Sequence, residues 1–117
     1  MREPNWLESR RAAVAGQPRR PSAARLRHNR AQILEGLSRV RGIDVIGADE
    51  LNRVIWIAPR DRTRADLVGQ AIEAENLPVQ SGPLGSLGLP LEDWFNANDL
   101  RTIVLSVTKV AYHLALT

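Results

Sequence analysis

Residues 52–81, NRVIWIAPRDRTRADLVGQAIEAENLPVQS, contain the signals that decide the fold. The run from Val54 to Ile57 is apolar and rich in β-branched and aromatic side chains, and it is bounded by Asn52 and Pro59. Such a run is typical of a strand that is buried on both faces. We therefore take this segment as the central strand.

A helix is expected after this strand. Thr63 and Asp66 stand three residues apart, as in a capping box that opens a helix, and Asn76 provides a C-terminal stop. The apolar positions between them recur at helical spacing, at Leu67, Val68, Ala71 and Ile72. Leu77–Val79 then reads as a short strand, and its proline favours an edge or a strand start. A strand–helix–strand unit implies parallel pairing, with the helix covering one face of the sheet.

Length and composition limit the possible classes of protein. The chain has 117 residues, of which 44% are hydrophobic, so it supports one small domain. Aromatic residues make up only 4%, so Trp56 and Trp94 are expected to supply much of the core, and Trp56→Ala is expected to cost about 3–5 kcal/mol. The absence of cysteine excludes disulfides, thiolate zinc sites and cysteine nucleophiles. No apolar run has membrane-spanning length, so we expect a cytoplasmic protein without a membrane partner.

Charge divides the chain into two parts. Residues 1–30 carry a net charge of +6, whereas the whole chain carries +3, so the remainder is mildly acidic. Three prolines and few apolar side chains in residues 1–21 indicate a basic arm with at most one short helix, near Leu7–Val14. Residues 22–117 form the predicted domain.

Two functions are open for the basic arm. Arginines within residues 2–30 can neutralise phosphates and bind nucleic acid. Alternatively, the arm is a solvated tail or a strap on a protein partner, with Trp6 as the anchor and a rim of Arg10, Arg11, Arg19 and Arg20. The nucleic-acid interpretation is the weaker one, because no nucleic-acid-reading motif accompanies the arginines and the acidic domain repels phosphate.

The domain is predicted to begin with a helix capped by Ser22 and closed by Gly42. Its apolar stripe consists of Leu26, Ile33, Leu34, Leu37 and Val40. Ile43 and Val45 alternate with Asp44 in a half-buried strand, which should form an antiparallel hairpin with the central strand.

Residues 81–94 read as a connector. Their glycines lack the lysine and hydroxyl of a phosphate-binding loop, so a crossing loop is favoured. Leu89–Leu91 and Trp94–Phe95 are too apolar for a free loop and should pack on the domain or on a partner. Asn96 or Asn98 is expected to cap a final helix over residues 99–114, and a strand over Ile103–Val107 is the fallback.

Residues that could carry chemistry are sparse. His28 and His113 lie on different predicted helices and match no metal spacing, so no metal site is predicted. The serines lack a neighbouring base pattern, and Lys109, in the middle of a helix, is expected to face solvent. We therefore predict no catalytic residue in this chain.

The order of elements nevertheless resembles a known architecture. The segments RVRGIDVI, NRVIWIAPRDRTRADLVGQAIEAENLPVQSG and LGLPLEDWFNANDLRTIVLSVTKVAYHLA look like the C-terminal small domain of fold-type I pyridoxal-phosphate (PLP) enzymes. The closest likeness is to the sugar aminotransferases of the DegT/DnrJ/StrS group, carried by Leu89–Leu91, Asp99–Leu100 and the apolar helix from Ile103 to Leu114. The expected fold is an α/β (α+β) two-layer sandwich in the order helix, strand, strand, helix, strand, helix.

This resemblance implies a role without catalytic residues. In that family the lysine, the phosphate cradle and the acid that hold PLP lie in a large domain, and none has a counterpart here. The resemblance therefore implies a non-catalytic small subunit that completes a heteromeric, aminotransferase-like biosynthetic enzyme acting on sugars or in secondary metabolism, with PLP held mainly by a larger partner subunit. The resemblance does not decide whether this chain is itself an enzyme. We expect no catalytic activity from the chain without its larger partner subunit.

Two further expectations concern binding. In the fallback strand, Arg101 would occupy the place where many fold-type I enzymes clamp a substrate carboxylate, whereas in a helix it is an exposed first-turn residue. A different class of function is a stand-alone regulatory or protein-docking domain, whose surface around Trp94 and Phe95 binds another protein.

Overall fold

The computed structural model describes residues 3–117; Arg2, part of the predicted basic arm, lies outside the described residues. The elements are α1 (Trp6–Val14), α2 (Ala23–Leu37), β1 (Ile43–Asp49), β2 (Val54–Pro59), the 3-10 helix η1 (Arg62–Arg64), α3 (Ala65–Ala74), β3 (Gln80–Ser81), the 3-10 helix η2 (Pro83–Gly85), β4 (Leu87–Pro90) and α4 (Ala97–His113). The predicted short helix near Leu7–Val14 is therefore present as α1.

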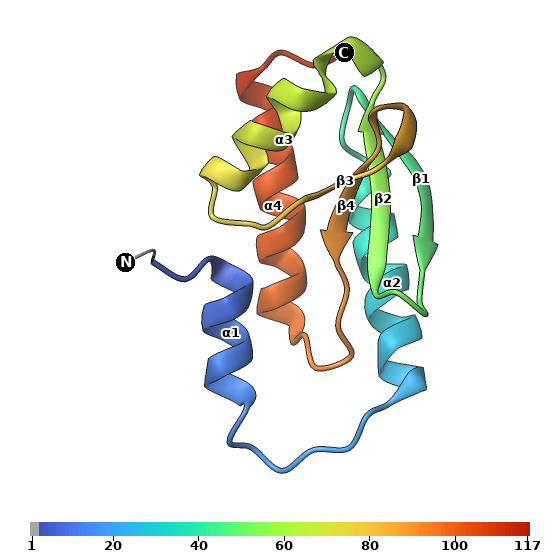
Figure 1. Ribbon diagram of the computed structural model, residues 1–117. Helices are drawn as coiled ribbons and strands as arrows, with labels where there is room; N and C mark the ends of the chain where they lie inside the picture. Colours follow the sequence, from blue (N-terminus) through green and yellow to red (C-terminus); the bar gives the residue numbers. More distant parts are fainter. Residues whose placement is uncertain (1–2) are drawn as a thin grey trace.

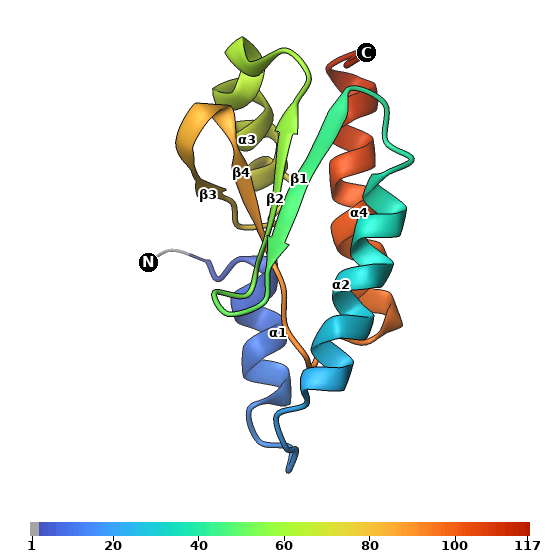
Figure 2. The same ribbon diagram turned by 90° about the vertical axis from the view of Figure 1, so that its right-hand side faces the viewer.

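The strands form one sheet with the order β1-β2-β4-β3, and all neighbouring strands are antiparallel. The predicted hairpin of β1 and β2 is confirmed. Helices α2, α3 and α4 lie together on one face of the sheet (Figures 1 and 2), and their apolar side chains share one core with those of the strands. The predicted two-layer α/β class is confirmed.

Two predictions around the end of the sheet are wrong. No strand forms at Leu77–Val79; β3 covers only Gln80–Ser81. It does not make the predicted parallel pair with β2, because β4 lies between them. The connector expected over residues 81–94 contains β4 itself. Gly88 lies within this segment, and a Cβ at this position would lie 2.8 Å from the Val54 side chain and 3.0 Å from that of Trp56. A strand glycine here marks a close approach to β2 rather than a turn.

The helix-capping predictions have mixed outcomes. Ser22 caps α2 by accepting the Arg25 N–H, and Asn96 forms a full capping box with Asp99 at the start of α4. The helix of α4 also rules out the fallback strand. The Thr63–Asp66 box is wrong, because Asp61 accepts the Thr63 N–H to cap η1, and α3 begins at Ala65 without a side-chain cap.

The two predicted helix stops lie in the left-handed region. Asn76 has φ +70°, just after α3, and Gly42 has φ +80° in the turn between α2 and β1. Left-handed residues of these types commonly follow the last turn of a helix. Asn76 thus ends α3 as expected, whereas Gly42 lies five positions after Leu37, the last residue of α2, and sets the entry into β1.

The core is aliphatic rather than aromatic. Ile55 and Ile57 of β2 are fully buried against the helical layer, together with Phe95. Trp56, between them, points to the uncovered face and is only partly buried, because alternate side chains of a strand face opposite sides. The expectation that Trp56 supplies much of the core bulk is therefore wrong.

Candidate functional site

Several of the predicted partner-binding residues meet around the loop of residues 91–96, which joins β4 to α4. The ring centroids of Trp94 and Phe95 lie 4.8 Å apart in an edge-on arrangement, and Trp6 approaches Phe95 at 5.7 Å from α1. Phe95 is fully buried, and Trp6 and Trp94 are partly buried. The sequence left open whether Phe95 packs on the domain or on a partner. In the structure Phe95 packs within this chain.

A buried carboxylate binds α1 to the start of α4. The Arg10 guanidinium donates from Nε to Asp99 Oδ1 at 2.7 Å and from Nη2 to Oδ2 at 3.1 Å. The Asp99 side chain is 4% exposed. Such bidentate pairs are among the stronger ionic contacts in proteins. The hydrogen bond to Asp99 raises the pKa of the Arg10 guanidinium above its ordinary value.

Two further acids precede α4. Asp93, whose side chain is 3% exposed, accepts the Ser22 N–H at 2.7 Å and an N–H of Arg19 at 3.3 Å. Glu92 accepts the indole N–H of Trp94 at 2.7 Å and pairs with Arg53 at 3.1 Å. Together with Asp99, these residues form a partly buried acidic cluster.

The arginines of the basic arm differ in their partners. Arg10 and Arg19 pair with the acidic cluster, as described above. Arg11 reaches Glu92 at 3.6 Å from a half-exposed position. Arg20 makes no ion pair within residues 3–117. The arm thus directs much of its charge at the chain's own acids, which lowers the charge left for nucleic-acid phosphates.

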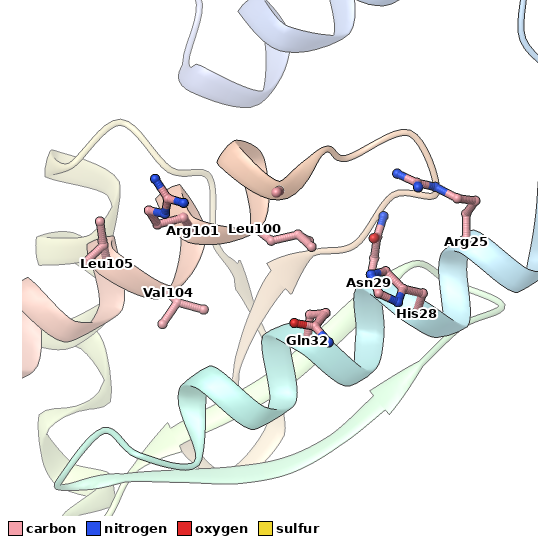
Figure 3. A pocket seen from close by; sticks show the side chains of 9 residues that line it. Arg25, His28, Asn29, Gln32, Leu100, Arg101, Val104 and Leu105 are labelled. Atoms are coloured by element: carbon pink, nitrogen blue, oxygen red, sulfur yellow. The ribbon is translucent and has the colours of Figure 1, made fainter.

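Arg101 lines a separate cavity between α2 and α4, of about 480 Å³. Figure 3 shows Arg25, His28 and Gln32 on α2, opposite Leu100 and Arg101 on α4. Arg101 is exposed on the helix, so the strand on which its substrate-clamp role depended is absent. No carboxylate lines this cavity.

Asn29, at the wall of the same cavity, is a functional candidate that the sequence analysis missed. It is fully buried, and its amide N–H groups donate to the carbonyls of Glu92 at 2.9 Å and Phe95 at 3.1 Å. The amide thus attaches α2 to the loop that carries the acidic cluster. The sequence did contain a signal for this role: Asn29 lies between Leu26 and Ile33 on the apolar stripe of the helix. A polar side chain buried at such a position needs hydrogen-bond partners.

The uncovered face of the sheet carries a third feature. Ile46, Trp56, Pro83 and Leu84 line a largely apolar depression of about 550 Å³, to which Arg62 and Ser86 also contribute. Leu84 is 91% exposed and has φ +57°. A largely exposed leucine in a left-handed conformation is unusual, and such strain is concentrated at functional positions.

The sole lysine, the potential metal ligands and the helices are further features of the described residues that bear on function. Lys109, the sole lysine of the sequence, forms an ion pair with Glu75 on the surface of α4 and does not fit a Schiff-base role toward PLP. Within residues 3–117, no group of three or more His, Cys, Asp or Glu side chains is arranged so that it could hold a metal ion. None of the helices in that range is long and apolar enough to cross a membrane.

A solved structure has an architecture similar to that of this chain. The crystal structure of an aminotransferase, TlmJ from Streptoalloteichus hindustanus, matches 92% of this chain with a TM-score of 0.66 and 16% sequence identity. The chain has the fold of an aminotransferase-like small domain. It spans 35% of the length of TlmJ. No family model and no curated protein matches the sequence.

Proposed function

We propose that this chain acts as the non-catalytic small subunit of a PLP-dependent, aminotransferase-like enzyme. The observation that supports this role is the fold, which corresponds to about a third of the chain of TlmJ. A larger partner subunit would hold the cofactor and the catalytic lysine. The likeness to sugar aminotransferases makes amino-sugar biosynthesis the first reaction class to test.

The chemistry of the chain supports a cofactor held by the partner. A PLP enzyme needs a lysine amine that faces a pocket and is partly desolvated. Lys109 is instead exposed and paired with Glu75. No step of the reaction is therefore assigned to residues of this chain, whose contribution is to form one wall of the cleft.

The uncovered sheet face is the surface that such a subunit would use. One side of the sheet is covered by α2, α3 and α4, whereas the other carries the exposed side chains of Ile46 and Leu84 beside the partly buried Trp56. Exposed apolar patches of this kind mark interaction sites. Arg101 lies in the helical layer, on the opposite side of the sheet, so this docking mode assigns it no contact with substrate.

Co-expression tests the proposal. The chain is produced together with a fold-type I large-subunit candidate encoded beside it, and the purified material is examined by sedimentation and by cofactor absorbance. A stoichiometric complex with a PLP spectrum that neither protein shows alone supports the proposal. A monomer that ignores the large subunit contradicts it.

Matched surface variants identify the docking face. Leu84→Asp should abolish the complex, because it places a charge on the uncovered apolar face. Leu51→Asp is the control, since Leu51 is 90% exposed and lies in the β1–β2 turn outside the depression. Equal loss, or equal retention, of the complex with both variants would exclude this face.

A further inference from the structure

Residues 5–21, which we call the strap, comprise α1 and the exposed stretch that leads to α2. In Figure 1, α1 stands beside the beginning of α4, and its backbone does not pack closely against any one element. In the described chain, one backbone hydrogen bond joins the strap to the domain, from the Trp6 N–H to the Asn76 carbonyl at 2.8 Å. Side chains therefore hold the strap in place.

These side chains are basic or apolar and share one face of α1. Trp6, Arg10 and Val14 recur at steps of four residues, which places them on one side of a helix. Trp6 contacts Phe95, Arg10 pairs with Asp99, and Val14 is buried. The surface beneath the strap thus contacts, in order along one face of α1, an aromatic, a cationic and an apolar side chain.

Each acid that binds the strap also has a partner in the rest of the chain. Asp99 accepts the Asn96 N–H at 2.9 Å, and Asp93 accepts the Ser22 N–H at 2.7 Å. Glu92 is bound by Trp94 and Arg53. A buried carboxylate left without a partner is strongly destabilising, but departure of the strap leaves none of the three in that state.

We propose that the strap docks and undocks as a unit over a docking surface formed by Glu92, Asp93, Asp99, Trp94 and Phe95, and that this surface binds a basic, aromatic helix of a partner chain. The strap occupies the surface in the free protein and competes with that helix. Charge complementarity supports this occupant, since residues 31–117 are mildly acidic and the surface presents three carboxylates. The proposal does not depend on the aminotransferase-like role.

A peptide supplied in trans tests the competition. The probe is a labelled synthetic peptide with the sequence of residues 5–21, and its binding to the full chain is followed by fluorescence anisotropy at low salt. In an Arg10→Glu/Arg19→Glu variant the tethered strap is released, and the peptide should bind at least about tenfold tighter than to the unaltered chain, because a tethered competitor acts at an effective concentration in the mM range. Added salt should weaken this binding.

Two controls separate specific docking from a change in net charge. An Arg20→Glu/Arg27→Glu variant changes the charge equally, but neither arginine forms an ion pair within the described residues, so it should bind the peptide as weakly as the unaltered chain. A peptide carrying Arg10→Glu should not bind the released variant. Equal binding by both double variants, or no binding to the released variant, overturns the proposal.

Hydrogen exchange of the unaltered chain provides a measurement that needs no variant. Amides of α1 should exchange together and faster than those of Ile103–Val110 in α4, because the strap opens without unfolding the domain. If α1 is as strongly protected as α4, the strap does not open separately and the proposal fails. This result remains informative if the charge-reversal variant does not fold.

Discussion

At the residue scale, adjacent positions of β2 have different roles. Ile57 is fully buried against the helical layer, whereas Trp56 lies on the uncovered face over Gly88. The alternation of side chains along a strand separates the two positions, although both belong to one apolar run. Burial, rather than side-chain size, should therefore decide which truncation costs more.

Truncating Ile57 should destabilise the domain more than truncating Trp56. Ile57→Ala creates a cavity in the core and is expected to cost about 2–5 kcal/mol. Trp56→Ala removes a partly exposed side chain and should cost less than Ile57→Ala. Urea denaturation of the two variants measures the order, and a larger loss for Trp56→Ala would show that the uncovered face is the better packed one.

The carboxyl group of Asp61 is expected to respond to its neighbour Thr63. The Thr63 hydroxyl donates to Asp61 Oδ1 at 2.7 Å, and this hydrogen bond lowers the pKa of Asp61 below its ordinary value of 3.8. Because the pKa is lowered in the folded state, the associated stabilisation is present above pH 3.8 and is lost as the pH falls through the folded-state pKa.

Thr63→Ala should raise the pKa of Asp61 toward 3.8, as measured by an NMR titration of the carboxyl group. Asp49 is an internal control, because its pKa is lowered by a separate hydrogen bond from the Asn52 side chain. A parallel shift of both carboxyl groups would argue against the local cause.

At the element scale, the start of α4 connects several parts of the chain. Asn96 and Asp99 satisfy each other's backbone N–H groups, and Asp99 also binds Arg10 of α1. Asn29 secures the preceding loop to α2 through its amide. Residues from α1, α2 and α4 therefore hold the start of α4 in place.

The two asparagines that the sequence offered as caps should differ in their effect. Asn96→Ala removes the capping side chain and is expected to cost about 0.5–2 kcal/mol. Asn98→Ala, on the exposed first turn, should have little effect or be slightly stabilising, because alanine is the better helix former. Thermal unfolding of both variants gives the comparison, and equal losses would place the cap elsewhere.

At the scale of the whole molecule, the two sides of the sheet are unequal. Three helices cover one side, and the other exposes the apolar depression around Trp56. An uncovered apolar face of a small domain is a site for association. The isolated chain should therefore self-associate as its concentration rises.

Ile46→Gln should reduce this self-association without altering the melting temperature by more than a few degrees, since Ile46 is 53% exposed. Leu105→Gln is the control, because Leu105 is 51% exposed but lies on α4, in the helical layer. Sedimentation velocity over a range of concentrations distinguishes the two. Equal behaviour of both variants would show that the uncovered face has no special tendency to associate.

The sequence by itself determined the local elements and their class: the helical stripes of α2 and α4, the apolar run of β2, the Ser22 and Asn96 caps and the left-handed Asn76. Each of these depends on residues close together in the chain, where spacing and capping chemistry act directly. Of the residues in the proposed docking surface, the sequence pointed to Trp94 and Phe95, and it also pointed to the arginines of the arm.

Only the tertiary structure decided how the segments meet. It inserted β4 between β2 and β3, because Gly88 permits a close approach to Trp56 that a sequence pattern reads as a turn. It also turned Arg10 and Arg19 toward Asp99 and Asp93, which lie more than seventy positions away along the chain. Contacts of such sequence separation depend on the packing of the whole domain, and no local pattern of residue types encodes them.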